Sequence, residues 1–100
     1  MKLWIDDVRP LPNDSYILCK SVNEAKKTIE QLEAQGTPIE LIDIDHDAGD
    51  YASDGGDYIR LLDWLEETER RYTIRIHSMN PVGVENMRRI IQKNAWKEIY

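Results

Sequence analysis

The sequence predicts a single α/β domain over residues 1–100, built around a parallel sheet with helices on both faces. Short apolar runs of strand length alternate with longer segments whose apolar residues recur at helical spacing, as in successive β–α–β units. Two of the apolar runs also end abruptly in acidic residues. A length of 100 residues with 41% hydrophobic residues suits one core and leaves little for a second.

Five apolar runs are predicted to be strands. The first, Lys2–Ile5, ends at Asp6-Asp7 and is followed by a loop marked by Pro10 and Pro12. The third also ends in acidic residues, and a loop rich in glycine and aspartate follows it over residues 48–57. The predicted strands are residues 2–5, 16–19, 39–44, 73–76 and 96–100.

Three segments are predicted to be helices. Ser21 suits an N-cap and Glu24 completes a capping box, while Gly36 and Pro38 end this first helix. Residues 58–70 and 84–92 carry the same helical spacing of apolar residues. The residues expected to face the core are Val22, Ala25, Ile29 and Leu32 in the first helix, Ile59, Leu62 and Leu65 in the second, and Met87, Ile90 and Ile91 in the third.

The order of these elements fits a flavodoxin-like domain of three layers with the strand order 2-1-3-4-5. The connection between the first two strands is too short for a long helix, so the first helix of such a domain is expected to be shortened to one turn or none. The last strand reaches residue 100, so no fifth helix is expected. This strand order places the carboxyl ends of the first, third and fourth strands side by side, where open α/β sheets bind ligands.

Acidic residues gather at those strand ends. Asp6 and Asp7 follow the first strand, and Asp45 and Asp47 follow the third. Carboxylates on adjacent strands repel one another unless a cation neutralises them, and oxygen ligands suit Mg²⁺ or Mn²⁺. We therefore expect a divalent metal site made by Asp6, Asp7, Asp45 and Asp47. The alternative is that these residues are solvated turn formers and helix caps.

The only two histidines of the chain also lie at strand ends. His46 follows the third strand and His77 the fourth. Because histidine transfers protons near neutral pH, both are candidate catalytic groups beside Asp45. The alternative is that either histidine merely hydrogen-bonds a carboxylate and holds its loop.

Three further residues are candidate phosphate ligands. Ser78 and Asn80 could donate hydrogen bonds to phosphate oxygens, although Asn80-Pro81 also suits a turn that starts a helix. Arg9 could contact a phosphate or pair with an acidic residue. These roles and the metal site together predict a pocket for a phosphate-bearing ligand.

Composition limits the partners and the compartment. A net charge of −6 disfavours binding along nucleic-acid backbones, but it does not exclude one phosphate-bearing end. No apolar run approaches the ~20 residues that span a bilayer, and the first residues lack the features of a signal peptide. The lone Cys19 cannot form an internal disulfide, so a reducing cytoplasm is expected.

The strand-end residues resemble those of response-regulator receiver domains. By that resemblance Asp6 and Asp7 match the metal-binding pair, Asp45 the phosphorylated aspartate, and Ser78 the residue that holds the phosphoryl group. A receiver also carries a lysine at the end of its fifth strand. Here Lys97 lies inside the predicted fifth strand, so that lysine has no good match.

A closer resemblance is to the receiver-derived family of cyclic-phosphate-processing receiver domains. The segments WIDDVRPLP, DIDHDAGD and IHSMNPVGVENM are similar to its three hallmark segments. The resemblance implies action on cyclic phosphate ends of nucleotides or RNA. It also implies catalytic or metal-binding roles for His46 and His77 beside the acidic residues.

Three functions remain open at this point. The leading hypothesis is a metal-dependent phosphoesterase in which a histidine moves a proton, or in which Asp45 is the nucleophile. The second is a signalling or phosphate-binding module that contacts a protein partner. The third is a receiver descendant that acts only as an interaction domain. The expected ligand is a phosphate-bearing small molecule or nucleic-acid end, with no membrane involved.

Overall fold

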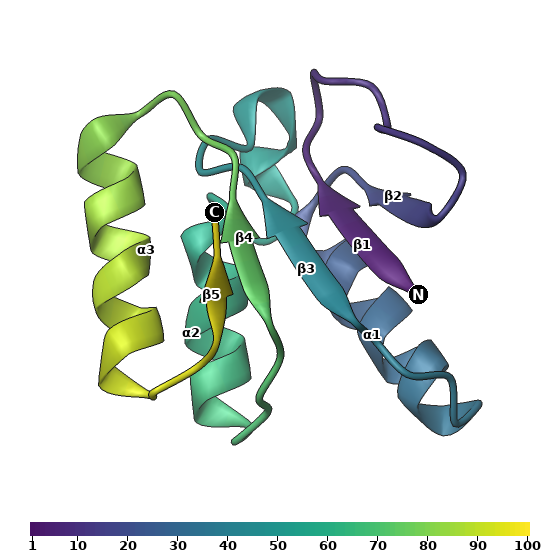
Figure 1. Cartoon of the computed structure of the whole chain (residues 1–100). Helices are drawn as coiled ribbons and strands as arrows, with labels where there is room; N and C mark the ends of the chain where they lie inside the picture. The colour runs from purple at the N-terminus through teal and green to yellow at the C-terminus, as the bar shows by residue number, and fades with distance from the viewer.

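The computed structural model describes residues 1–100 and contains a five-stranded sheet and three helices (Figure 1). The strands are β1 (Lys2–Ile5), β2 (Tyr16–Cys19), β3 (Leu41–Ile44), β4 (Ile74–Ile76) and β5 (Glu98–Ile99). The helices are α1 (Val22–Ala34), α2 (Ile59–Glu67) and α3 (Pro81–Lys93), with a short 3₁₀ helix η1 (Gly49–Ser53) after β3.

The sheet is parallel throughout and has the order β2-β1-β3-β4-β5, which confirms the predicted class and strand order. Residues 6–15 join β1 to β2 without a helix, and β5 is the last element of the chain. The carboxyl ends of β1, β3 and β4 therefore lie next to one another at one edge of the sheet.

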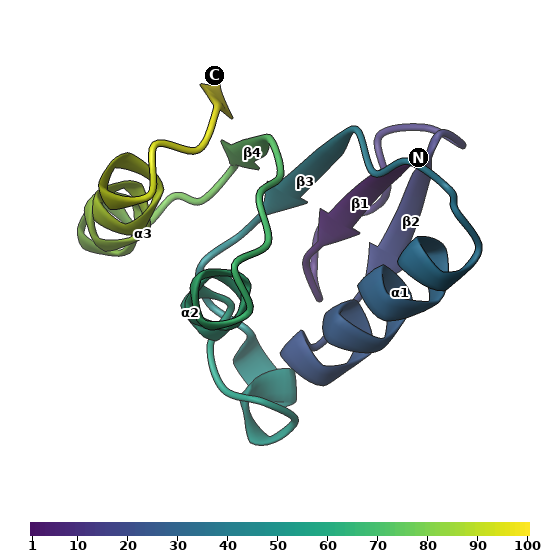
Figure 2. The same ribbon diagram turned by 90° about the horizontal axis from the view of Figure 1, so that it is seen from below.

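The expectation of helices on both faces of the sheet was wrong. Figure 2 shows α1, α2 and α3 on the same side of the sheet. The reason is the handedness of the crossovers, since parallel strands are joined by right-handed connections. The connections that carry the three helices all run across the sheet in one direction, from β2 towards β5, so all three helices reach the same face. A helix between β1 and β2 would run the opposite way, and a loop takes its place.

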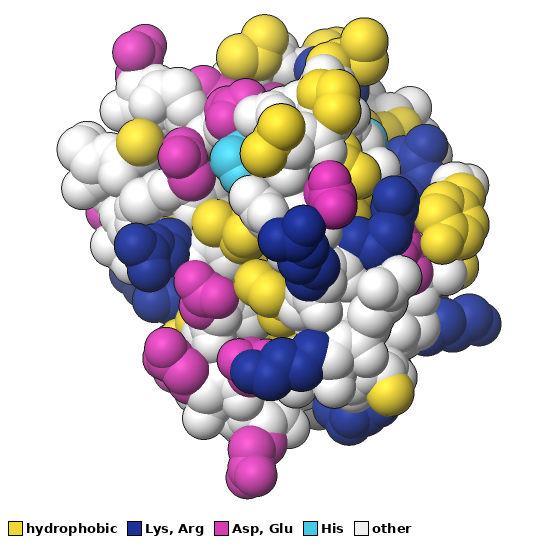
Figure 3. Space-filling view, turned by 90° about the vertical axis from the view of Figure 1, so that its left-hand side faces the viewer, with side chains coloured by type: hydrophobic (Ala, Val, Ile, Leu, Met, Phe, Trp, Pro, Cys, Tyr) yellow, Lys and Arg dark blue, Asp and Glu magenta, His cyan; other side chains and the backbone are white.

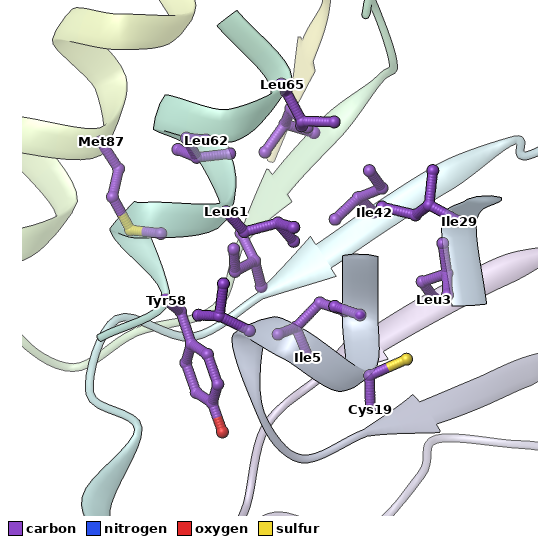
Figure 4. Close-up of a cluster of buried hydrophobic side chains, with 14 of the residues drawn as sticks. Leu3, Ile5, Cys19, Ile29, Ile42, Tyr58, Leu61, Leu62, Leu65 and Met87 are labelled. Carbon is purple, nitrogen blue, oxygen red and sulfur yellow. The ribbon is translucent and has the colours of Figure 1, made fainter. Parts of the chain in front are cut away.

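The core lies between the sheet and the helices (Figure 4). Strand alternation turns Leu3 and Ile5 of β1 and Ile42 and Ile44 of β3 towards the helices, and all four are fully buried. The residues between them, including Trp4 and Asp43, face the side without helices. No helix is both long enough and apolar enough to span a bilayer.

Several predicted element ends moved by a few residues. The third strand starts at Leu41, because the Glu40 N–H donates to the Met1 carbonyl outside the regular ladder. The α3 helix starts at Pro81, three residues before the predicted start, because the Asn80 side chain caps it by accepting from Gly83 N–H. Ser21 caps α1 as predicted, accepting from Glu24 N–H at 3.0 Å.

Candidate functional site

Asp6 is held rigidly at the end of β1. Its carboxylate is fully buried, and Oδ1 accepts hydrogen bonds from Val8 N–H at 2.9 Å and Arg9 N–H at 3.3 Å. Its Oδ2 lies 2.9 Å from Nε2 of His77. Burial opposes ionisation, but the hydrogen bonds from Val8, His77 and Arg9 outweigh it and lower the pKa of Asp6. Asp6 is therefore a fixed, ionised carboxylate.

His77 joins the ends of three strands. Its Nδ1 lies 2.6 Å from Asp43 Oδ1, and its Nε2 contacts Asp6, so both ring nitrogens are engaged. The ring stacks on Trp4 with centroids 3.9 Å apart, and the side chain is only 4% exposed. Both nitrogens can donate only when the imidazole is protonated. In this arrangement His77 is a buried link between two carboxylates.

Asp43 continues this chain of contacts across the helix-free face of the sheet. It is fully buried on β3, and its Oδ2 accepts from Arg75 Nη1 at 3.1 Å. The Tyr16 hydroxyl lies 3.5 Å from the same oxygen. Asp43 thus has partners on β2 and β4, and it supports the site instead of lining it.

Asp7 and Asp45 supply the unpaired charge of the site. Asp45 Oδ1 accepts from His46 N–H at 2.8 Å, and neither aspartate pairs with a lysine or an arginine. Burial, followed by the negative charges of Asp6, Asp45 and Asp50, raises the pKa of Asp7. Burial and the same cluster also raise the pKa of Tyr58 above its ordinary value. The electrostatic potential around Asp7 and Asp45 is therefore negative, because no lysine or arginine forms an ion pair with either carboxylate.

His46 differs from His77 in having one free nitrogen. Its Nδ1 lies 2.8 Å from Asp47 Oδ1, and its Nε2 has no hydrogen-bond partner. Because every buried side-chain nitrogen and oxygen has a partner, this free Nε2 reaches the surface. A Cβ on Gly83 would lie 2.5 Å from the ring, so α3 packs its backbone directly against His46.

The loop after β4 forms the other border of the site. Ser78 Oγ accepts from Asn80 N–H at 3.1 Å, and Asn80 Oδ1 caps α3. Asn80 therefore has the helix-start role that the sequence offered as its alternative, and its Nδ2 has no protein partner. Arg9 donates through Nη1 to the backbone carbonyl of His77, which ties the β1–β2 loop to the end of β4. It pairs with no acidic side chain.

The arrangement fits a divalent cation in part. Ligand atoms of Asp6, Asp45 and His77 lie within 4.8 Å of one another. His77 is already bonded through both nitrogens, so the carboxylates of Asp6 and Asp45 are the better ligands, with Asp7 beside them. The acidic residues without basic partners are the donor set that Mg²⁺ or Mn²⁺ prefers. Asp47 differs, because its side chain is 63% exposed and turned to His46.

The sequence alone identified most of these residues but not how they contact one another. The predicted strand order placed Asp6, Asp45 and both histidines at the carboxyl ends of the strands, and they lie there in the structure. The sequence did not identify Trp4 as the stacking partner of His77. Strand alternation was the available signal, because Trp4, Asp43 and Arg75 pair in register and share a face.

Lys97 lies far from the site in the fold. It precedes β5, and its carbonyl accepts from Ile74 N–H at the amino end of β4. In a parallel sheet that is the edge opposite Asp45. Lys97 therefore does not supply the strand-5 lysine of the receiver pattern, and the chain departs from ordinary receivers at this point.

Comparison with known proteins places the chain in a family. A family model described as "Cyclic-phosphate processing Receiver domain" matches residues 1–93. No curated protein matches the chain significantly. No solved structure does so either. Since the match covers nearly the whole chain and the sheet has the receiver-like strand order, this protein belongs to the cyclic-phosphate processing receiver domain family.

Proposed function

We propose that this domain is a divalent-metal-dependent phosphoesterase that opens cyclic phosphate ends of nucleotides or RNA. The observation that carries the proposal is the position of His46. It follows Asp45 directly, is oriented by Asp47 and keeps Nε2 free at the surface. A histidine held in this way is suited to proton transfer, and the neighbouring carboxylates without basic partners are suited to a cation.

The residues divide the chemistry as follows. Asp6, Asp7 and Asp45 would hold Mg²⁺ or Mn²⁺, which supplies Lewis-acid polarisation of a phosphoryl oxygen. His46 Nε2 accepts a proton from the attacking water as the new P–O bond forms. The bond from phosphorus to one ribose oxygen breaks, and that oxygen takes up a proton from the imidazolium or from solvent. His77 holds Asp6 in place through its buried contact.

Neutral and basic donors border the same edge. The Ser78 hydroxyl, the Asn80 amide and the remaining N–H groups of Arg9 can donate to phosphate oxygens. Each is anchored by one contact that fixes its position, which lowers the entropy lost on binding. Together they provide the phosphate-holding side of the site.

The test is an activity assay with purified, folded protein and Mg²⁺ or Mn²⁺. The substrates are a 2′,3′-cyclic nucleotide and a short RNA with a 2′,3′-cyclic end, followed by chromatography or ³¹P NMR. We expect turnover in the wild type and a loss of roughly 100-fold or more in His46→Ala and Asp45→Asn, the scale of a lost acid–base group or ligand. Asp14→Asn is the matched control, since Asp14 is an exposed aspartate in the β1–β2 loop.

Two results would contradict the proposal. Folded wild-type protein that turns over neither substrate with either cation would remove it. Equal rates in the wild type and in His46→Ala would remove the role given to His46, even if the substrates were consumed.

A second candidate is a phosphate-accepting signalling module. It is favoured by one observation, namely that Asp45 Oδ2 has no hydrogen-bond partner and so is available to accept a phosphoryl group. The absence of a lysine from β5 at this edge speaks against it, because that lysine is the group that contacts the phosphoryl group in the receiver pattern. Incubation with acetyl phosphate followed by intact mass measurement tests this candidate. A phosphoryl adduct that Asp45→Asn removes would favour signalling.

A further inference from the structure

We propose that a groove along α3 binds the nucleotide next to the cyclic phosphate, so that the preferred substrate is an oligoribonucleotide end and not a free cyclic mononucleotide. This inference rests on the proposed function, because it takes the acidic edge as the place where the cyclic phosphate binds. It adds a second binding site and a preference in chain length.

The groove has the size of a ligand site. Its volume is about 650 Å³, within the roughly 300–1,000 Å³ that small-molecule sites occupy. Its lining comes entirely from the loop after β4 and from one side of α3. It begins at Ser78, the residue directly after His77, whose ring contacts Asp6. This end of the groove lies at the start of α3, where Gly83 packs against the ring of His46, the residue directly after Asp45.

The chemistry of the lining changes along its length. Met79, Pro81 and Val84 form its apolar end near the site, and Met79 is 83% exposed. Arg88 and Arg89 follow further down α3. Figure 3 shows this face, with hydrophobic side chains gathered towards the ends of the strands and basic side chains below them. An apolar surface followed by guanidinium groups suits a nucleoside followed by its phosphate.

The spacing agrees with a ligand of more than one nucleotide. Arg88 comes seven residues after Pro81, which is roughly 10 Å along the helix axis. A cyclic phosphate bound at the strand ends would thus leave the next phosphate within the part of the groove that carries the two arginines. A free cyclic mononucleotide has no second phosphate to place there.

The two arginines are held differently. Arg88 forms an ion pair with Glu98 through two nitrogens, Nε at 2.9 Å and Nη2 at 2.7 Å. These contacts fix the guanidinium group and leave Nη1 without a hydrogen-bond partner. Arg89 pairs with Glu85 one turn away on α3, and both side chains are more than two-thirds exposed. Exposed pairs of this kind are weak, so a phosphate can replace Glu85 as the partner of Arg89.

The test compares two substrates and two arginine variants. The substrates are a 2′,3′-cyclic mononucleotide and a dinucleotide that ends in the same cyclic phosphate. We expect kcat/KM of the wild type to be roughly tenfold or more higher for the dinucleotide, and Arg89→Glu to remove most of that ratio. Arg60→Glu is the matched control, because Arg60 is 68% exposed on α2 and also pairs within its helix. It should leave the ratio unchanged.

Failure of the groove and failure of the proposed function give different results. Equal kcat/KM for the two substrates, or an unchanged ratio in Arg89→Glu, would overturn the proposal that the groove binds a second nucleotide. The proposed hydrolysis of the cyclic phosphate would still be supported. If neither substrate is turned over, ¹H–¹⁵N NMR with a dinucleotide 3′-phosphate and Mg²⁺ decides the question. Shifts at Met79, Val84 and Arg89 would support the groove, and their absence would overturn it.

Discussion

At the scale of single residues, His46 and His77 have opposite hydrogen-bond arrangements. His77 is enclosed by Asp6, Asp43 and the ring of Trp4, whereas His46 keeps one nitrogen free. From the sequence, the two histidines were equal candidates, because both follow a strand. The contacts separate them into a positioning residue and a residue able to exchange protons with a ligand.

Asp7 gives a pH-dependent prediction. Burial and its negative neighbours raise the pKa of Asp7, so the folded state holds this proton more tightly than the unfolded state. Ionisation of Asp7 therefore lowers the free energy of unfolding. This loss grows as pH rises from the unfolded-state pKa of 3.8 through the raised folded-state pKa. Without metal, we expect Asp7→Asn to stabilise the domain near pH 7 by up to about 1 kcal/mol, the scale of partly exposed charges.

Urea denaturation at several pH values measures this effect. The stabilisation by Asp7→Asn should shrink as pH falls through the raised folded pKa, and it should vanish below the unfolded value of 3.8, where Asp7 is protonated in both the folded and the unfolded state. A variant that is less stable than the wild type near neutral pH would show that Asp7 is held by favourable partners.

Gly83 is predicted to set the position of His46. A Cβ at Gly83 would lie 2.5 Å from His46 Cγ and Cδ2. Alanine in a helix normally gains about 1 kcal/mol over glycine, but overpacking costs about 1–3 kcal/mol. We therefore expect Gly83→Ala to be destabilising and to lower turnover.

A double-mutant cycle tests this contact. In a His46→Ala background the ring is gone, so Gly83→Ala should become neutral or stabilising in urea denaturation. The same destabilisation in both backgrounds would mean that the cost arises elsewhere.

At the scale of elements, the site depends on the ends of β1, β3 and β4 being joined through His77. Removing one partner of a buried ion pair costs about 3–5 kcal/mol, because the other charge stays buried without a partner. We expect His77→Ala to lose stability up to this scale, since it removes the only side-chain partner of the buried Asp6 carboxylate, while Asp43 keeps its ion pair with Arg75. His46→Ala is the matched control and should cost clearly less, because Asp47 is exposed. Equal losses in urea denaturation would rule out the linking role of His77.

The elements themselves were largely predictable from local patterns. The N-cap at Ser21 and the apolar spacing of α1 act within a few residues, and both were confirmed, although Glu24 takes part in the cap only through its backbone N–H. The early start of α3 was missed, because the interpretation relied on apolar spacing from Val84 and gave Asn80 two competing roles. The stacking of His77 on Trp4 was not predictable locally, because it depends on the register of strands that are far apart in sequence.

At the scale of the whole molecule, the helices on one face leave the other face of the sheet to polar side chains and the β1–β2 loop. The Trp4 indole donates to the Arg9 carbonyl, so this loop is tied over the face at the edge of the site. Strand lengths and the spacing of apolar residues in the helices do not show on which face of the sheet each helix lies. That follows from the direction of each crossover, which fixes the face a helix reaches.

Binding of a divalent cation should stabilise the whole domain. A ligand present at about 100 times its dissociation constant adds about 2.7 kcal/mol, and a domain of this size gains roughly 4–8 °C in Tm for each kcal/mol. We therefore expect Mg²⁺ to raise the Tm by roughly 10–20 °C near neutral pH. The rise should persist in Asp14→Asn and largely disappear in Asp45→Asn. An equal rise in both variants would indicate a nonspecific effect of the cation.

The central claim is that the carboxylates of Asp6, Asp7 and Asp45 form a cation site, and Mn²⁺ tests it most directly. Paramagnetic broadening in ¹H–¹⁵N spectra should remove the amide signals of Asp7, Asp45 and Gly49 first. Those of Arg71 and Lys97, at the opposite edge of the sheet, should persist, and Asp45→Asn should weaken the effect. Broadening that is absent at millimolar Mn²⁺, or that centres on acidic residues elsewhere, would contradict the account.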